Sequence, residues 1–460
     1  MTIRDNGGVP RLIAAVSTNV TGSVLTAAAG VGATGLLARR LPVSEFGTIL
    51  LLLTAVNAFA IFEGLRPVVI HRVAMGRECP AKLFNVAYQI NGAMAVVTIG
   101  CLVAGFLAGA GLNLPVLAKF FVALTVIAFF VSVQYWTFLD AEQDTVFTGL
   151  SRAVGWVGLY VSFGVLAILK AKLLFYTAAL LSMYVLLAVV FRFRLRQQGF
   201  IEKYRDEERG GDIEPLMYAA FSNIVFNICA VTINVADRAI VGTIMGARVA
   251  GFYAGPSEFA LRAVGLVRAG VQVVLPWAAR LSDREQDKYW SFGALLSLVV
   301  VGSGCAVLLP IRRSVVTLLL GPAFTWTGDL LGLFSLGVVA STLGYVCIVR
   351  LNVRGDFQTQ RRLYLAAATL ILAGASAGAL SGNLRNVALA FLAARCVDVV
   401  LFILLICRLP GFVSRWFLMI GCAMVSALGM GWAGYVGGVF ALLALTWGLA
   451  YWFWRTVLDS

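Results

Sequence analysis

Long apolar stretches recur along the whole chain and constrain its fold more than any other feature. A helix needs about 20 mostly apolar residues to cross the roughly 30 Å hydrocarbon core of a bilayer. We count fourteen such stretches, at residues 12–37, 46–65, 85–108, 117–139, 153–169, 173–191, 215–236, 252–276, 291–310, 327–349, 363–381, 387–407, 416–435 and 437–454. The sequence therefore predicts an all-α polytopic membrane protein with about fourteen transmembrane helices.

Composition agrees with this prediction and leaves no stretch for a soluble domain. Of the 460 residues, 60% are apolar and 13% are charged, and the mean hydropathy is +0.91. The formal net charge of +14 could suggest a nucleic-acid partner. Most of the Lys and Arg residues, however, lie in segments that face one side when the N-terminus is inside. Since cytoplasmic loops retain basic residues, we expect both termini in the cytoplasm and no nucleic-acid partner.

A weak internal repeat divides the chain. A shift of 204 residues places residues 18–47 over residues 222–251 without a gap, so that Asn19 meets Asn223. Few positions are identical, and chance similarity is the alternative. The repeat predicts two six-helix bundles related by a pseudo-twofold axis along the membrane normal, as in transporters with substrate between their halves. The predicted parts are an N-terminal bundle (1–192), a cytoplasmic linker (193–214), a C-terminal bundle (215–407) and two further helices (408–460).

Polar side chains form stripes on the first span of each repeat. At 100° per residue, one face of the seventh span holds Asn223, Asn227, Asn234 and Asp237. The first span holds Asn19 and Ser23 on one face. Polar groups that face lipid are costly, so both stripes should face protein or water. We favour a hydrated central cavity that both stripes line, and hydrogen bonding between helices is the alternative.

Charged residues also lie inside two predicted spans. Glu258 and Arg262 are four residues apart with the acid first, which is the better order for a helical ion pair. Arg262 lies near the membrane midplane, and Arg268 follows it in the same span. We favour anion binding for these two arginines, with a structural salt bridge as the alternative. For Arg395 and Asp398 in the twelfth span, we favour the structural salt bridge.

The adjacent pair Asp237 and Arg238 lies between two long apolar runs. We place this pair at the outer end of the seventh helix, where it would either fix or gate the loop to the eighth. The sequence does not choose between these roles. Arg395 and Asp398 are further candidates for gating or for coupling to an energy source.

Several residue types that carry chemistry are missing from the sequence. His71 is the single histidine, the eight cysteines are dispersed, and no P-loop motif occurs, so we expect no metal, no cofactor and no direct use of ATP. A membrane polymerase, ligase or glycosyltransferase needs acids or histidines in a substantial outer loop. The longest expected outer connection, residues 311–326, contains neither. We therefore expect a protein that is not an enzyme.

Two sequence stretches resemble a known family. "LARRLPVSEFG" (37–47) and "ADRAIVGTIMGARVAGFY" (236–253) are similar to the corresponding stretches of polysaccharide repeat-unit flippases, which serve O-antigen and exopolysaccharide biosynthesis. These flippases belong to the multidrug, oligosaccharidyl-lipid and polysaccharide exporter superfamily. The length and the layout of six, six and two helices are also similar. The resemblance implies two bundles around a V-shaped cavity that opens alternately to either side of the bacterial inner membrane.

The resemblance also implies a substrate and partners. The substrate would be an undecaprenyl-pyrophosphate-linked oligosaccharide that moves from the cytoplasmic to the outer leaflet. Membrane lipids, and polysaccharide polymerase and export machinery, would be the partners. A cationic cavity would hold the pyrophosphate, a role that carries over only to Arg262 and Arg268, and the last two helices would line part of a groove for the polyprenyl tail.

Two alternatives to a flippase stay open. One is a drug or organic-cation antiporter of the same superfamily, and the less favoured one is a polymerase or ligase. Cation binding needs an unpaired carboxylate near the midplane. This sequence places an arginine beside both of its midspan acids, Glu258 and Asp398.

Overall fold

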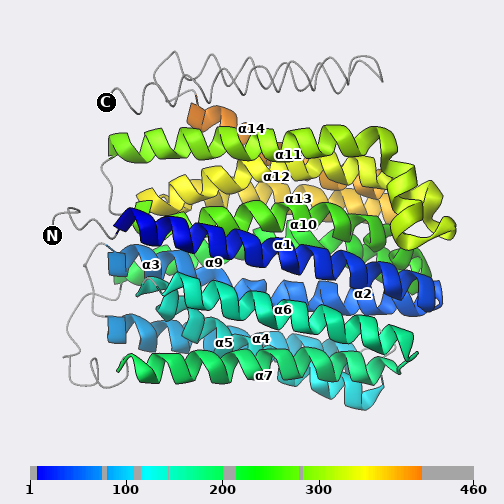
Figure 1. Cartoon of the computed structure of the whole chain (residues 1–460), viewed down its shortest axis with the longest axis horizontal. Helices are drawn as coiled ribbons and strands as arrows, with labels where there is room; N and C mark the ends of the chain where they lie inside the picture. The colour runs from blue at the N-terminus through cyan, green and yellow to red at the C-terminus, as the bar shows by residue number, and fades with distance from the viewer. Residues whose placement is uncertain are drawn as a thin grey trace.

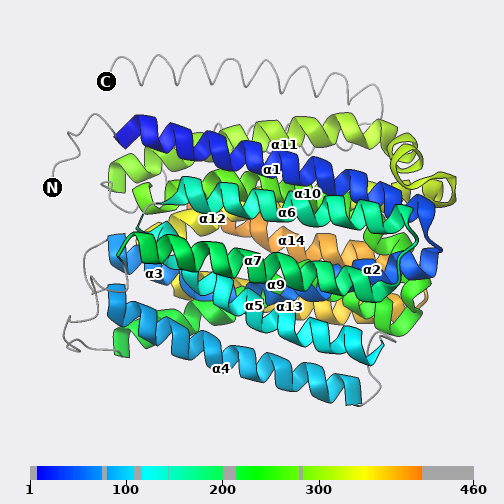
Figure 2. The same ribbon diagram turned by 60° about the horizontal axis from the view of Figure 1, so that its bottom comes forward.

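The computed structural model describes residues 8–74, 80–107, 115–142, 144–199, 214–278 and 283–406. Within these ranges every regular element is a helix, and the helices lie side by side with their axes along the longest dimension of the molecule (Figures 1 and 2). They are α1 (Gly8–Arg40), α2 (Val43–Ala58), η1 (Phe59–Leu65), α3 (Arg66–Ala74), α4 (Pro80–Leu107), α5 (Val116–Ala141), α6 (Thr145–Ile168), α7 (Leu173–Gln197), α9 (Glu214–Met245), α10 (Ala247–Ala278), α11 (Asp283–Leu320), η2 (Pro322–Thr327), α12 (Gly328–Arg354), α13 (Phe357–Leu380) and α14 (Leu384–Ile406).

Short connections reverse the chain between these helices. Leu41 and Pro42 join α1 to α2, and Gly246 alone joins α9 to α10. Gly246 has a φ of 88°, a conformation that glycine adopts without the steric cost that other residues meet. We call the end of the molecule that holds Gly246 the Gly246 end, and the opposite end, where α1 begins, the Gly8 end.

The predicted all-α polytopic architecture is confirmed. Eight helical segments among the described residues are long and apolar enough to cross a membrane: Val16–Arg40, Val43–Ile70, Val116–Ala141, Thr145–Ile168, Leu173–Gln197, Ala220–Met245, Pro322–Arg354 and Phe357–Leu380. Helices α4, α10, α11 and α14 overlap four further predicted spans. The predicted spans 416–435 and 437–454 lie outside the described residues, so the total of fourteen stays a prediction.

The helices follow the register of the sequence repeat. Helix α2 begins at Val43 and α10 begins at Ala247, which is the same shift of 204 residues. The packing also corresponds, because α1 lies along α6 in the first half and α9 lies along α13 in the second. We call α1–α7 the N-terminal bundle and α9–α14 the C-terminal bundle. The residue boundaries of these bundles remain a prediction.

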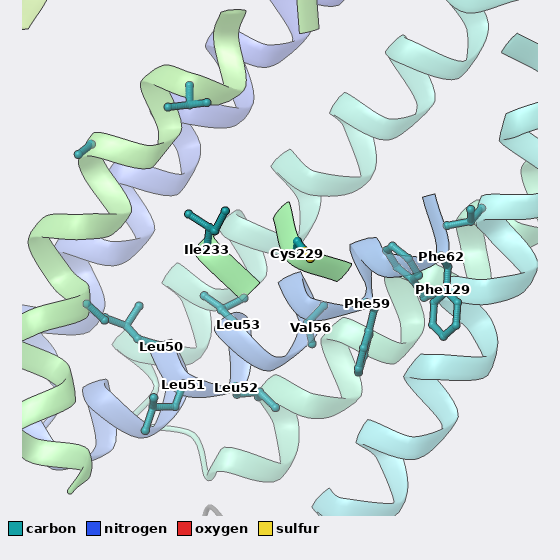
Figure 3. Close-up of a cluster of buried hydrophobic side chains, with 14 of the residues drawn as sticks. Leu50, Leu51, Leu52, Leu53, Val56, Phe59, Phe62, Phe129, Cys229 and Ile233 are labelled. Carbon is teal, nitrogen blue, oxygen red and sulfur yellow. The ribbon is translucent and has the colours of Figure 1, made fainter. Parts of the chain in front are cut away.

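Helix α2 has a central position. Leu50 to Leu53 point in all directions around the helix and all four are buried, so protein surrounds α2 here. Figure 3 shows these side chains near Ile233 and Cys229 of α9, with Phe59 and Phe62 of η1 beside Phe129 of α5. The segment α2–η1 therefore joins the two bundles through an apolar core.

The two bundles meet closely at the Gly246 end. A Cβ atom added to Gly47 of α2 would lie 1.8 Å from the carbonyl oxygen of Ala247 in α10. Phe46 of α2 also packs edge-on against Phe324 of η2, with ring centroids 5.7 Å apart. Because the backbones themselves are in contact, this end of the interface is closed.

Residues 311–326, the longest outer connection predicted, are largely helical, and their position outside the membrane stays a prediction. Helix α11 continues through Pro310 to Leu320, and η2 follows immediately. Arg312 and Arg313 form salt bridges of 3.0 and 2.8 Å with Asp329 of α12.

Candidate functional site

A cavity of about 320 Å³ lies between the two bundles. Helices α1 and α6 form much of one wall, and α9 and α10 contribute to the other. The cavity extends from Thr145, the first residue of α6 at the Gly8 end, to Arg262 near the middle of α10. Its volume is at the low end of the range for small-molecule sites, which is about 300–1,000 Å³.

Arg262 reaches from the C-terminal bundle into the N-terminal bundle. Its Nη2 lies 3.3 Å from Oγ1 of Thr34, and its guanidinium carbon lies 4.6 Å from the centre of the Tyr160 ring. A Cβ atom on Gly30 would lie 1.6 Å from its Nη1, so only glycine leaves room for the guanidinium here. The predicted pair with Glu258 is present at 3.6 Å. Arg262 therefore lines the cavity and also connects the two bundles.

The position predicted for Asp237 and Arg238 is wrong. Both side chains are buried in the protein. Helix α9 continues past them to Met245, so the pair does not end the helix. Asp237 accepts hydrogen bonds of 2.8 Å from the Tyr253 hydroxyl and from the backbone N–H of Arg238. Arg238 forms a salt bridge with Glu258. Because each charge has a partner of opposite sign, the pair can lie within an apolar helix.

A third ion pair lies on the N-terminal wall of the cavity. Arg66 of α3 contacts Asp140 of α5 at 2.8 Å, and the hydroxyl of Thr148 donates to the same carboxylate. This pair was not predicted from the sequence, because the predicted span 46–65 stops one residue before Arg66. An arginine at the end of an apolar run looks like a loop residue until its buried partner is known.

Helix α6 supplies three cavity residues that the sequence analysis also missed. The predicted span began at residue 153, but α6 begins at Thr145 and includes Arg152. Arg152, Trp156 and Tyr160 are four residues apart in turn, and all three line the cavity. That spacing is a signal of one helical face, and it is visible only when Arg152 is included in the helix.

The residues that line the cavity include more arginines than acids. Four arginines line it, namely Arg66, Arg152, Arg238 and Arg262, whereas its acidic lining residues are Asp140 and Glu258. Arg262 Nε is buried and has no hydrogen-bond partner among the described residues. Electrostatic attraction is stronger in a cavity of low dielectric than in water. The site is therefore suited to an anion.

The polar stripe on α1 lies partly at this cavity. Asn19 and Ser23 both line it. The Asn19 side chain also donates a hydrogen bond of 3.1 Å to the carbonyl of Thr145, which ties α1 to α6 within the N-terminal bundle.

The corresponding stripe on α9 serves a different purpose. Asn223 donates to the carbonyl of Gly64, and Asn227 donates to the carbonyls of Ala60 and Ile61, the latter at 3.1 Å. These residues lie outside the lining of the cavity between the bundles. Their placement corrects our preference for a cavity position and matches the alternative, hydrogen bonding between helices. The reason is that η1 places its backbone oxygens against α9.

The remaining candidates form a second polar cluster in the C-terminal bundle. Arg395 and Asp398 of α14 make the predicted salt bridge at 3.3 Å. Asn234 accepts a hydrogen bond from Arg395, and Tyr364 donates one to Asp398. Arg395, Asp398 and Tyr364 are buried, Asn234 is partly buried, and the cluster lies outside the cavity lining. Arg268, the other arginine predicted to bind an anion, lies in α10, and its side chain is outside what the structure describes.

Comparisons with known proteins agree with this architecture. A family model described as "Polysaccharide biosynthesis protein" matches residues 36–329. The solved structure of the lipid II flippase MurJ in an inward closed conformation is similar, with a TM-score of 0.68 and 11% identity over 96% of this chain and 99% of that chain. A eukaryotic MATE transporter has a TM-score of 0.62 and 11% identity, covering 88% of this chain and 97% of that one.

A Vibrio cholerae MATE transporter variant gives a TM-score of 0.59 and 11% identity over 85% of this chain and 95% of that chain. No curated protein sequence matches at a significant level. At identities this low, the likeness to solved structures shows the fold alone. The resemblance inferred from residues 37–47 and 236–253 is thereby confirmed at the level of family and fold.

Proposed function

We propose a function from one premise: the chain belongs to the polysaccharide biosynthesis protein family. The protein moves a polyprenyl-pyrophosphate-linked oligosaccharide from the cytoplasmic to the outer leaflet of the bacterial inner membrane. It acts as a transporter by alternating access and not as an enzyme. The Gly8 end and both termini face the cytoplasm, and polymerase and export machinery take up the product.

The observation that carries this proposal is the environment of Arg262. The guanidinium lies between the bundles, in a cavity with more arginines than acids, and its Nε has no partner among the described residues. A pyrophosphate carries negative charge and several acceptor oxygens, and arginine binds phosphate groups through parallel hydrogen bonds. A lipid-linked pyrophosphate therefore matches the site in charge and in hydrogen-bonding capacity.

The closed Gly246 end supports the transport direction. Backbone contact at Gly47 and Gly251 separates the cavity from the side predicted to be outside. The cavity begins near the α5–α6 connection at the Gly8 end, which is the side predicted to be cytoplasmic. A substrate would enter from the Gly8 end and leave after α2 and α10 separate. The fold shared with a flippase in an inward closed conformation is consistent with this arrangement.

Ion pairing argues against an organic-cation antiporter. Asp140 pairs with Arg66, Glu258 pairs with Arg238 and Arg262, and Asp398 pairs with Arg395. A cationic drug would have to compete with a resident guanidinium at each of these carboxylates. An anionic substrate would instead meet the excess of positive charge.

The test is reconstitution of the purified full-length protein in proteoliposomes. Three labelled compounds are compared: a polyprenyl-pyrophosphate-linked oligosaccharide, an ordinary anionic phospholipid and an organic cation. We expect the saccharide-linked lipid to become accessible to an impermeant enzyme on the opposite leaflet, while the other two are not moved. Transport of the organic cation without transport of the saccharide-linked lipid would contradict the proposal.

A further inference from the structure

Two aromatic side chains of α6 line the cavity in an unusual arrangement. Trp156 and Tyr160 are one helical turn apart, with ring centroids separated by 5.7 Å and ring planes inclined by 28°. Both rings are partly exposed and both line the cavity. The Phe129–Tyr184 pair in the same bundle differs, because its rings meet at 74° and are buried in the core.

The outer face of a stacked pair of rings offers a ligand a flat apolar surface. The core pairs interlock edge to face and leave no such surface, whereas Trp156 and Tyr160 are stacked on each other and both line the cavity, with Arg262 over the Tyr160 ring. Aromatic faces carry a partial negative charge that attracts the positive edges of C–H bonds. A sugar ring has one face made of such C–H bonds and a rim of hydroxyl groups. A saccharide is therefore a chemical match for this surface.

The position of Arg262 determines which sugar would lie there. Its guanidinium is 4.6 Å from the centre of the Tyr160 ring, so the anion-binding group and the aromatic pair adjoin. In a pyrophosphate-linked saccharide, the first sugar is bonded directly to a phosphate oxygen. A phosphate held at Arg262 would therefore place that sugar beside Tyr160 and over Trp156.

Hydrogen-bonding groups for the hydroxyl rim are available nearby. Ser23 of α1 and Asn57 of α2 line the same cavity. In the part of the chain that the structure describes, neither side chain has a hydrogen-bond partner. A polar group in a membrane cavity that binds no protein atom is free to bind a ligand.

We propose that Trp156, supported by the Tyr160 ring stacked on it, forms a saccharide platform that binds the first sugar of the substrate, with Ser23 and Asn57 contacting its hydroxyl groups. This inference rests on the proposed function and adds a second recognition element to it. Arg262 selects for the pyrophosphate, and the platform selects for a sugar on that pyrophosphate. Polyprenyl pyrophosphate without a sugar would use the first element alone.

The test compares two ligands on the same purified full-length protein in detergent. One ligand is polyprenyl pyrophosphate, and the other is polyprenyl pyrophosphate carrying the oligosaccharide. The ratio of the two dissociation constants is independent of the folded fraction of a sample. We expect Trp156→Leu to lower affinity for the saccharide-linked ligand by about three- to tenfold, which corresponds to one aromatic contact, and to leave affinity for the sugar-free ligand unchanged.

Two further variants sharpen this test. Trp156→Phe keeps a ring and should retain most of the preference for the saccharide-linked ligand. Trp326→Leu makes the same change as Trp156→Leu at a half-exposed tryptophan of η2 outside the cavity lining, and it should change neither affinity. An unchanged ratio in Trp156→Leu would overturn the platform while leaving the proposed function intact. If wild-type protein bound neither ligand, the proposed function would fail and the platform with it.

Discussion

Helices α1 and α9 occupy equivalent places in the repeat, yet their polar stripes make different contacts. On α1, Asn19 bonds to α6 within its own bundle and lines the cavity with Ser23. On α9, Asn223 and Asn227 bond across the interface to carbonyl groups of η1. One helix exposes its stripe to the cavity, and the other uses its stripe to hold the two bundles together.

The difference arises from the neighbours of each helix and not from the stripes themselves. Helix α9 lies against η1, a 3₁₀ segment whose carbonyl groups accept bonds from asparagine. Helix α1 lies against α6 and α10, where small residues such as Gly30 leave room for Arg262. Equivalent sequence patterns in a repeat can therefore have different roles, one in holding the two bundles together and one in lining a cavity. Substitutions on α9 should affect stability, and substitutions on α1 should affect transport.

The largest effect is expected at Asp237 of α9. Asp237→Leu removes a buried carboxylate that accepts bonds from Tyr253 and from the backbone of Arg238, and it leaves a buried guanidinium with less compensation. Breaking such a buried charged network costs about 3–5 kcal/mol. We expect loss of most folded protein, measured by size-exclusion chromatography of detergent extracts.

Asp329→Leu is the matched control for that change. Asp329 is half-exposed and pairs with Arg312 and Arg313 near the Gly246 end. Exposed salt bridges contribute about 0–1 kcal/mol, so the folded yield should remain near that of the wild type. Equal losses in Asp237→Leu and Asp329→Leu would show that the buried network of α9 has no special structural role.

A smaller loss of stability is expected at Asn227. Asn227→Leu removes the bonds to the carbonyls of Ala60 and Ile61 and should cost about 1–3 kcal/mol. The melting temperature in detergent should fall, while the same change at the exposed Asn386 should leave it unchanged. If Asn227→Leu abolished transport at an unchanged melting temperature, the stripe of α9 would have a functional role. The proposed difference between α9 and α1 would then be wrong.

Gly30 on α1 should show the opposite pattern. In Gly30→Ala, the new methyl group would overlap the guanidinium of Arg262, so the arginine must move. We expect affinity for the saccharide-linked lipid to fall by about tenfold, the equivalent of one charge-assisted hydrogen bond, with little loss of folded protein.

Gly32→Ala makes the same change on the same helix where no atom lies within 4 Å. It should leave affinity unchanged and add a small gain in helix stability, because alanine is the better helix former by about 1 kcal/mol. Similar affinities in Gly30→Ala and Gly32→Ala would remove the argument that Gly30 exists to accommodate Arg262.

Hydropathy predicted most of the fold because the membrane sets the length and the composition of a spanning helix. The predictions failed where charged residues are compensated by partners far away in sequence. Arg66 and Arg152 marked the ends of predicted spans, although both line the cavity. Asp237 and Arg238 were assigned to a helix end, although Tyr253 and Glu258 allow them to be buried.

The candidate site was predictable only in part for the same reason. The Glu258–Arg262 pair follows from the spacing of a single helix, and the structure contains it. The contacts of Arg262 with Thr34, Gly30 and Tyr160 join elements more than a hundred residues away in the chain. A sequence repeat identifies equivalent positions, but it does not predict which residues of other helices each position contacts.

A double substitution separates a role of Arg262 in holding the anionic group of the substrate from a purely structural role. In Arg262→Gln, Glu258 keeps its salt bridge with Arg238, so the protein should fold at normal levels and lose transport. Arg262→Lys retains the charge and should keep partial activity. Arg385→Gln, the same change at an exposed arginine of α14, should retain full transport.

The deciding measurement is transport of the saccharide-linked lipid by the double variant Glu258→Gln with Arg262→Gln, together with its folded abundance. If Arg262 contacts the substrate, the double variant will be inactive per folded molecule, and its abundance will fall because Arg238 loses its Glu258 partner. If Arg262 served only to offset part of the charge of Glu258, removing both charges would restore transport per folded molecule. Recovery of transport in the double variant would therefore contradict the account.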